Sequence, residues 1–138
     1  MNLASLITDN IAELLVKIVE FTQARQTILS RNINNVHSYG FVPEDLAVDE
    51  FSELLGEAID EHIRNQRLVL RDTESIKFGV SGSFKVKPIV DEYAKELLEE
   101  SRDEYLELQI SKLMENSLNQ RVAAELLRQK QGMISIFE

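Results

Sequence analysis

The residues whose types suit metal or acid–base chemistry are the carboxylates and the two histidines, His37 and His62. A dimetal site in a helical bundle needs a Glu-x-x-His pair on each of two helices, and neither histidine has a glutamate three positions before it. Glu57, Asp60 and Glu61 lie near His62 in the sequence, but a run of carboxylates on one helix face is usually a solvated surface. We therefore expect no metal site and no cofactor.

Nucleophilic chemistry has no better basis in this sequence. The chain contains no cysteine, which excludes disulfides, thiolate nucleophiles and thiolate metal ligands. The segment 79–82, Gly-Val-Ser-Gly, lacks the Gly-x-Ser-x-Gly spacing of a nucleophile elbow, and no glycine-rich loop precedes Lys and Ser or Thr. We expect the protein not to be an enzyme.

The charge of the chain is unevenly distributed. The net charge of −9 argues against nucleic-acid binding, which needs clustered Lys and Arg. Residues 1–40 and 108–138 are close to neutral, whereas residues 41–64 carry eight acids and one base, and residues 91–107 carry eight acids and two bases. This pattern predicts that the two ends contact protein and that the middle faces water.

Neither a membrane segment nor a cleaved export signal is predicted. No apolar run approaches the roughly 20 residues that span a bilayer. The N-terminus lacks a basic region followed by an apolar core and a small-residue cleavage site. We expect no direct lipid binding, and any export without a cleaved signal.

Two long helices must carry most of the structure, because apolar residues recur at helical spacing near both ends of the chain. The N-terminal segment has steps of four and three that form a heptad seam: Ile7, Ile11, Leu14, Ile18, Phe21, Arg25, Ile28 and Asn32. The C-terminal segment carries a second stripe: Leu106, Ile110, Leu113, Met114, Leu118, Val122, Leu126 and Leu127. The two segments match in length and predict an antiparallel pair.

The middle of the chain predicts shorter elements. A helix is expected at about 49–65, with Asp49 as a candidate N-cap. Alternating apolar residues at about 66–90 indicate a small β-hairpin, and the alternative is a mobile loop. A helical pattern resumes at Asp91, and Ser101 with Glu104 has the spacing of a capping box, so the helix is expected to restart there after a kink.

The predicted fold is therefore mostly α, with long N- and C-terminal helices paired as an antiparallel coiled-coil-like bundle, a short central helix and a candidate hairpin. We divide the chain into an N-terminal helix and turn (1–40), an acidic central region (41–100) and a C-terminal helix (101–138). The apolar residues of 133–137 form a tail with no predicted cover. The broad stripes, with polar Arg25 and Asn32 at seam positions, favour self-assembly or partner-helix binding about as much as a monomeric bundle.

The stretch from Arg25 to Phe41 resembles the N-terminal signature of the flagellar basal-body rod proteins. In that family a helix bearing Arg and Leu runs into Asn-Ile-Ala-Asn-Val-x-Thr-Pro-Gly-Tyr. Ser38 and Phe41 take the Thr and Tyr positions, while Asn34 and Tyr39 replace Ala and Pro. The positions that match unchanged are Asn32, Ile33, Asn35, Val36 and Gly40.

A second match lies at the other end of the chain. Residues 106–118 read Leu-Glu-Leu-Gln-Ile-Ser-Lys-Leu-Met-Glu-Asn-Ser-Leu. This run is similar to the C-terminal signature of the same family, Glu-Met-x-x-Met-x-Glu-Asn followed by a Leu-rich helix. The short chain is most like the proximal rod members, and residues 42–100 carry no resemblance.

The resemblance implies a structural subunit that is exported by the flagellar type III apparatus and polymerises into a hollow rod in the periplasmic portion of the basal body. The implied partners are copies of itself, other rod subunits, the inner-membrane ring or its rod adaptor, and the export apparatus. The predicted assembly interface comprises Leu14, Ile18, Phe21, Arg25, Ile28, Asn32, Asn35, Gly40, Leu106, Ile110, Leu113, Met114, Asn116, Leu118 and Leu127. The alternative is a soluble helical adaptor or regulatory domain that binds a protein partner through its acidic helix.

Overall fold

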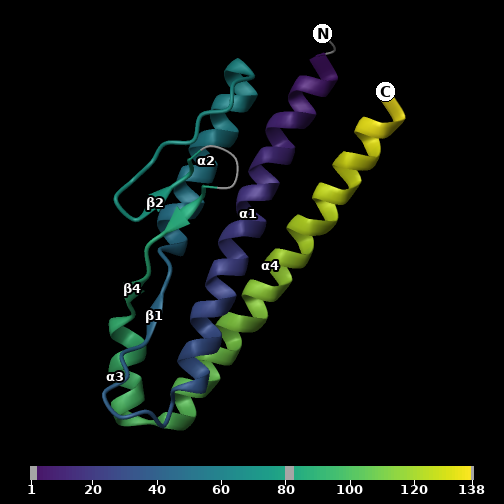
Figure 1. The fold of residues 1–138 in the computed structure, drawn as a ribbon. Coiled ribbons are helices and arrows are strands. Elements are labelled where there is room, and N and C mark those ends of the chain that lie inside the picture. The colour runs from purple at the N-terminus through teal and green to yellow at the C-terminus, as the bar shows by residue number, and fades with distance from the viewer. Residues whose placement is uncertain (1–2, 80–82, 138) are drawn as a thin grey trace.

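The computed structural model describes residues 3–79 and 83–137, with side chains described for residues 10–79 and 83–132. Two long helices dominate this part of the chain, α1 (Leu3–Asn34) and α4 (Arg102–Phe137). They run antiparallel, so the two chain termini lie at the same end of the molecule (Figure 1). The predicted pairing of long terminal helices in a mostly α fold is confirmed.

The shorter helix α2 (Val48–Asn65) lies on one side of α1, and α4 lies on the other (Figure 1). Its predicted extent is nearly correct, but the prediction that Asp49 caps it is wrong. Ala47 occupies the N-cap position without a side-chain hydrogen bond, and Asp49 lies in the first helical turn. A carboxylate there still interacts favourably with the helix dipole.

An aromatic core joins α1 to the central region. The rings of Phe21 and Phe51 stack with their centroids 4.0 Å apart, and Phe78 and Phe84 pack at the edge of this pair. Phe21, Phe51 and Phe78 are almost fully buried. The remaining buried members of this cluster are Ile28, Leu46, Leu54 and Ile76.

The predicted hairpin is present. Strand β2 (Ile76–Lys77) pairs antiparallel with β3 (Lys85–Val86). A second pairing was not predicted, between β1 (Glu44–Asp45) and β4 (Ile89–Val90). It joins the start and the end of the central region, so that region leaves the helix pair and returns to it at one place (Figure 1).

The restart of the helix near Ser101 is also confirmed. Helix α3 (Glu92–Glu100) begins after Asp91, whose carboxylate accepts a hydrogen bond from Ala94 N. After Ser101, α4 begins at once, and Ser101 Oγ accepts a hydrogen bond from Glu104 N at 3.3 Å. Helix α4 continues to Phe137, through the segment 133–137 that was predicted to form an apolar tail. The side chains of that segment lie outside the described residues.

The turn after α1 is built by side chains of the N-terminal signature. Asn35 Nδ2 donates to Arg31 O at 2.9 Å, and Ser38 Oγ donates to Asn35 Oδ1 at 2.9 Å. Gly40 has φ +75°, a left-handed conformation that glycine adopts without steric cost. The turn therefore forms although Tyr39 stands at the position of the signature proline.

Candidate assembly surface

The predicted interface residues divide into three groups by burial within the single chain. Leu14, Phe21, Arg25, Ile28, Asn32 and Asn116 are buried. Ile18, Asn35, Leu106, Leu113 and Leu127 are partly buried, and Gly40, Ile110, Met114 and Leu118 are exposed. The first group holds α1 to its own neighbours, so the surface that remains for a partner is carried mainly by α4.

Polar side chains hold α1 and α4 in register. Asn32 Nδ2 donates to Gln109 Oε1 at 2.9 Å and to Glu44 O at 2.7 Å. Farther along the pair, Asn116 Nδ2 donates to Thr22 O at 2.7 Å. Buried polar groups at a helix interface favour the alignment that gives them partners. This alignment does so for the amides of Asn32 and Asn116 and for Gln109 Oε1, whereas Gln109 Nε2 is buried without a partner among the described residues.

Tyr105 closes the end of α1. Its hydroxyl donates to Asn32 O at 2.8 Å, and the side chain is fully buried. Asn32 lies in the last turn of α1, where backbone carbonyls have no partner within the helix. Burial, together with the charge of Asp91, raises the pKa of Tyr105 to about 12, so the hydroxyl remains a donor at neutral pH.

Four charged residues meet where the central region joins the helix pair, and we call them the charge cluster. Arg25 donates twice to Asp45, at 2.9 and 3.0 Å. Lys112 donates to Asp45 at 3.0 Å and to Asp91 at 2.6 Å. The cluster thus links α1, β1, the residue that caps α3, and α4.

The charge cluster favours the ionised forms of Asp45 and Lys112. Burial alone would raise the pKa of Asp45, but hydrogen bonds and charge from Arg25 and Lys112 outweigh it and lower the pKa. Burial alone would lower the pKa of Lys112, but its bonds to Asp91 and Asp45 raise the pKa overall. Asp45, although part of the acidic middle that was predicted to face water, is therefore a buried ion-pair partner.

A continuous apolar stripe remains exposed on α4. Its members recur every four residues, and each has between 44% and 69% of its surface exposed. Such a row is one of the ridges that helices use when they pack together, and a row of exposed apolar side chains on a folded chain is a candidate interaction surface. The α4 stripe consists of Ile110, Met114, Leu118, Val122 and Leu126.

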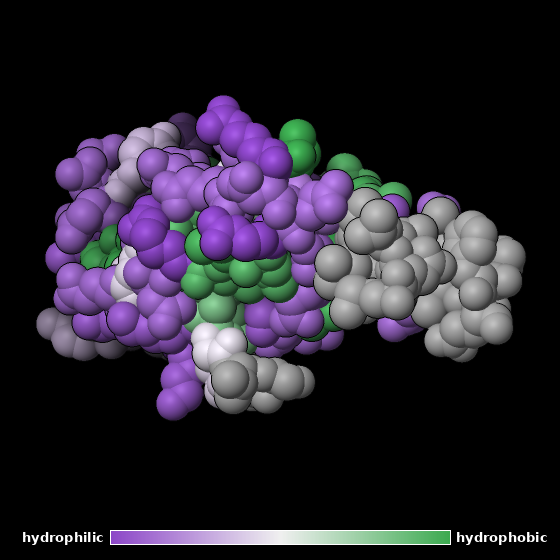
Figure 2. Space-filling view, turned by 90° about the horizontal axis from the view of Figure 1, so that it is seen from above, coloured by the Kyte–Doolittle hydropathy of each residue, from purple (hydrophilic) through white to green (hydrophobic). Residues whose placement is uncertain are grey.

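The C-terminal part of the α4 stripe borders an apolar groove of about 400 Å³. Its floor is formed by α1, with Leu15, Ile18 and Phe21, and its walls by α2 and α4; we call it the three-helix groove. The walls contribute Val48, Phe51, Ser52, Leu55, Asn116, Leu118, Asn119, Val122, Ala123 and Leu126. Viewed from the end where the termini lie, apolar surface emerges in the middle of a largely hydrophilic outline (Figure 2).

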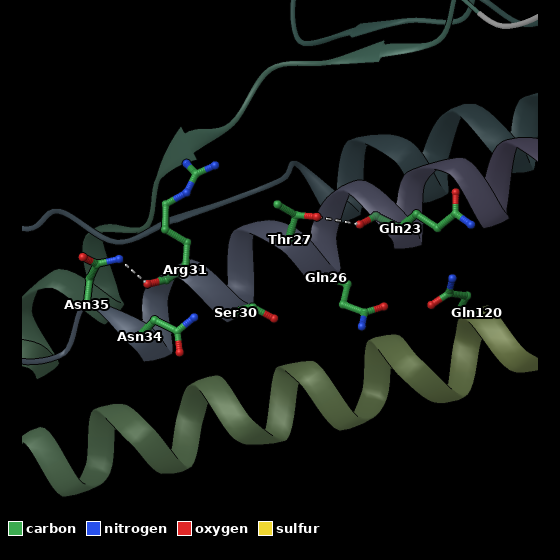
Figure 3. A pocket seen from close by; sticks show the side chains of 8 residues that line it. All are labelled: Gln23, Gln26, Thr27, Ser30, Arg31, Asn34, Asn35 and Gln120. Carbon is green, nitrogen blue, oxygen red and sulfur yellow. Dashed lines mark hydrogen bonds between the residues drawn. The ribbon is translucent and has the colours of Figure 1, made fainter.

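A second hollow between α1 and α4 is polar. It is lined by uncharged side chains and Arg31, and the amides of Gln26 and Gln120 point toward each other across it (Figure 3). One hydrogen bond among its lining residues stays within α1, from Thr27 Oγ1 to Gln23 O, and another joins the following turn to α1, from Asn35 Nδ2 to Arg31 O. The remaining lining residues are Ser30 and Asn34. An open, solvated hollow of this kind offers little apolar surface to a partner.

The carboxylates near His62 do not converge. Glu57 pairs with Arg71, and Glu61 pairs with Arg67. His62 is buried, with its Nδ1 3.3 Å from Asn10 Nδ2 of α1. Within residues 10–79 and 83–132, no three His, Asp or Glu side chains lie close enough together to hold a metal ion.

Sequence reasoning missed several residues of the polar interface, namely Asp45, Asp91, Tyr105, Gln109 and Lys112. The one available signal was Arg25, because a charged residue at a heptad seam requires a counter-charge when it is buried. The sequence has 24 acidic residues from which that partner had to be chosen.

No helix in the part of the chain that the structure describes is both long enough and apolar enough to cross a bilayer. Comparisons with protein-family models, with curated proteins and with solved structures find no match to this chain.

Proposed function

We propose that this chain is a structural subunit of the bacterial flagellar basal-body rod, in its proximal part, and that it assembles with copies of itself through the terminal helices. The observation that carries the proposal is the α4 stripe. Its first three members lie in residues 106–118, the run that resembles the C-terminal rod signature, and all five of its apolar side chains are exposed in the single chain. Burial of such a row against neighbouring subunits supplies the free energy for assembly.

Two further observations support the proposal. The turn from Asn35 to Gly40, which carries the N-terminal signature, is held by its own hydrogen bonds and redirects the chain away from the helix pair. The buried amides of Asn32 and Asn116 fix the register of α1 against α4. A subunit built this way presents the same helix surface in every copy, as a repeating assembly requires.

The proposal includes a place in the cell. The mature assembly lies in the periplasmic part of the basal body, after export through the flagellar type III apparatus without a cleaved signal. Its neighbours there are other rod subunits and the inner-membrane ring or its rod adaptor. No cofactor and no catalysed reaction form part of the proposed function.

The test combines genetics with solution measurements. Deletion of the gene in its own organism is expected to abolish motility and to stop flagellar assembly at the basal body, and the wild-type gene is expected to restore both. Complementation with Leu118→Glu, which places a charge in the middle of the α4 stripe, is expected to fail, whereas Val69→Glu, at an exposed position outside the stripe, is expected to succeed. Normal flagella in the deletion strain would contradict the proposal.

Sedimentation velocity of the purified chain over a concentration series separates this function from the alternative. A rod subunit is expected to form larger species as its concentration rises. A small species that does not change with concentration, combined with binding of a basic protein partner, would instead favour an adaptor that acts through the acidic helix α2.

A further inference from the structure

The α4 stripe does not lie on one straight face of its helix. At 100° per residue, residues four positions apart are offset by about 40°, so a row with this spacing winds around the helix. Val122 and Leu126, at its C-terminal end, line the three-helix groove, whereas Ile110 and Met114 do not. Twelve positions separate Met114 from Leu126, a net rotation of about 120°. Helix α4 therefore presents two different apolar surfaces, one inside the groove and one outside it.

The outer surface continues as a straight face toward the C-terminus. From Met114, steps of three and four residues lead to Ser117, Arg121, Ala124 and Arg128. This face, which we call the outer face of α4, begins with Ile110 and Met114 and becomes basic toward its end. Its two bases are Arg121 and Arg128, of which Arg128 also pairs with Glu125 within α4.

The edge of the groove has the opposite charge. Helix α2, which forms one wall, carries six acids and one base. Ser52 lies on the groove side of α2, and Asp49 and Asp60 follow around the helix beside it, both exposed. An apolar groove with an acidic edge thus lies on the same chain as an apolar face with a basic end. Electrostatic attraction favours docking in which the basic end of the α4 face lies against the acidic edge of α2, rather than docking in the reverse direction.

We propose that successive copies of this chain associate head to tail, with the outer face of α4 of one copy inserted into the three-helix groove of the next. Ile110 and Met114 enter the apolar part of the groove, and Arg121 and Arg128 lie against the acidic edge of α2. Because the two surfaces differ, a pair joined by this contact still has one free outer face and one free groove. Further copies can add at both, so the assembly grows rather than closing as a dimer. This inference rests on the proposed function and adds to it which surfaces of the subunit meet.

The experiment uses one variant for each surface of the full-length chain. Met114→Glu charges the outer face at a position that is 69% exposed. Ser52→Arg places a long basic side chain at the edge of the groove, at another exposed position. The matched controls are Met114→Leu and Ser52→Ala. All four proteins are expected to keep the helical circular dichroism and the urea midpoint of the wild type, because both positions are exposed.

Sedimentation velocity is then run on each variant alone and on an equimolar mixture of Met114→Glu and Ser52→Arg. Each of these two variants alone is expected to associate at least tenfold more weakly than the wild type, while the controls associate normally. The mixture is expected to form dimers and no larger species, because each variant retains one intact surface that the other can use.

Two results would overturn the inference. If both variants associate as the wild type does, or if their mixture remains monomeric, the two surfaces do not meet, although assembly of the wild type would leave the proposed function standing. If the wild type itself remains monomeric at every concentration, the proposed self-assembly fails as well. The two failures are therefore distinguishable.

Discussion

At the scale of single residues, the charge cluster shows how one polar position in a heptad seam is satisfied. Arg25 lies in the seam of α1, and its guanidinium bonds to both carboxylate oxygens of Asp45. Lys112 adds a second cation to the same carboxylate. Asp45 therefore joins two helices that are far apart in the sequence, and its charge is needed for both contacts.

Replacing Asp45 with Asn leaves Arg25 buried without its counter-charge. We expect Asp45→Asn to lower the free energy of unfolding by about 3 kcal/mol at pH 7. The pKa of Asp45 is lower in the folded state than in the unfolded state. The stabilisation by its charge is therefore present above about pH 4 and is lost as the pH falls through the folded-state pKa. Urea denaturation at pH 7 and at pH 3 should show the difference between variant and wild type shrinking at the lower pH.

The matched control is Asp60→Asn, because Asp60 is exposed on α2. A change in the free energy of unfolding within about 0.5 kcal/mol is expected for it. An equally small effect of Asp45→Asn at pH 7 would show that the buried ion pair contributes nothing to stability.

Tyr105→Phe removes the donor that the carbonyl of Asn32 uses at the end of α1. We expect a loss of about 1–2 kcal/mol in the free energy of unfolding at pH 7, because a buried acceptor is left without a partner. The folded-state pKa of about 12 lies above the unfolded value near 10, so the contribution is complete below about pH 10 and is lost as the pH rises through 12. The difference in the free energy of unfolding between wild type and variant, measured by urea denaturation, should stay constant up to about pH 10 and narrow between about pH 10 and pH 12. Tyr93→Phe, at an exposed position, is the control and should change little.

At the scale of elements, the sequence predicted the helices well because their signal is local. The seam of α1 repeats over eight positions, and the capping residues Asp91 and Ser101 announce the starts of α3 and α4. Helix α2 was found from its apolar spacing, although its cap was assigned to the wrong residue. The apolar repeat of a helix lies within one segment of the sequence, so it can be recognised without knowledge of the rest of the fold.

The pairing of β1 with β4 could not be predicted from a local pattern. Each strand has only two residues, too few for an alternating pattern, and the partners lie far apart in the sequence. The partner of Arg25 was hidden for the same reason, since nothing local distinguishes Asp45 from the other acids. Long-range contacts between short or single elements depend on the packed fold rather than on a pattern.

Two glycines offer a test at this scale, Gly79 in the hairpin and Gly40 in the turn after α1. Gly79 has φ +64°, and a Cβ there would lie 2.3 Å from Ser83 Oγ and 2.7 Å from Ser83 O. Gly40 has φ +75°, but a Cβ added there would meet no atom within 4 Å. We expect Gly40→Ala to cost about 1 kcal/mol from backbone conformation alone. Gly79→Ala should cost at least twice as much, because the backbone of Ser83 must also move. Thermal denaturation of the two variants measures the difference, and equal losses would contradict the predicted clash.

At the scale of the whole molecule, the two long helices are not held together evenly. The hydrogen bonds between them involve Tyr105, Gln109 and Asn116 of α4. Beyond Asn116, Ala123 is the one buried residue of α4 within the described side chains, and the helices diverge toward the end that carries the termini (Figure 1). The outer half of α4 therefore has fewer stabilising contacts in the single chain.

Hydrogen exchange should report this gradient. In the monomer, amides of residues 105–116 are expected to exchange more slowly than those of residues 124–132, because local opening follows contact density. On assembly, the second group is expected to gain protection, since it then packs against a neighbour. Uniform protection along α4 in a verified monomer would contradict both the gradient and the need for a partner.

The short ladder between β1 and β4 allows the central region to change in length. Because Glu44 pairs with Val90 and Asp45 pairs with Ile89, residues 46–88 form a long loop whose two ends are joined by the β1–β4 ladder. The entropic cost of closing such a loop grows only with the logarithm of its length. Insertions in the exposed segment that follows α2, at residues 65–67, would therefore leave the geometry of α1 and α4 unchanged. The size of the central region can vary independently of the two long helices.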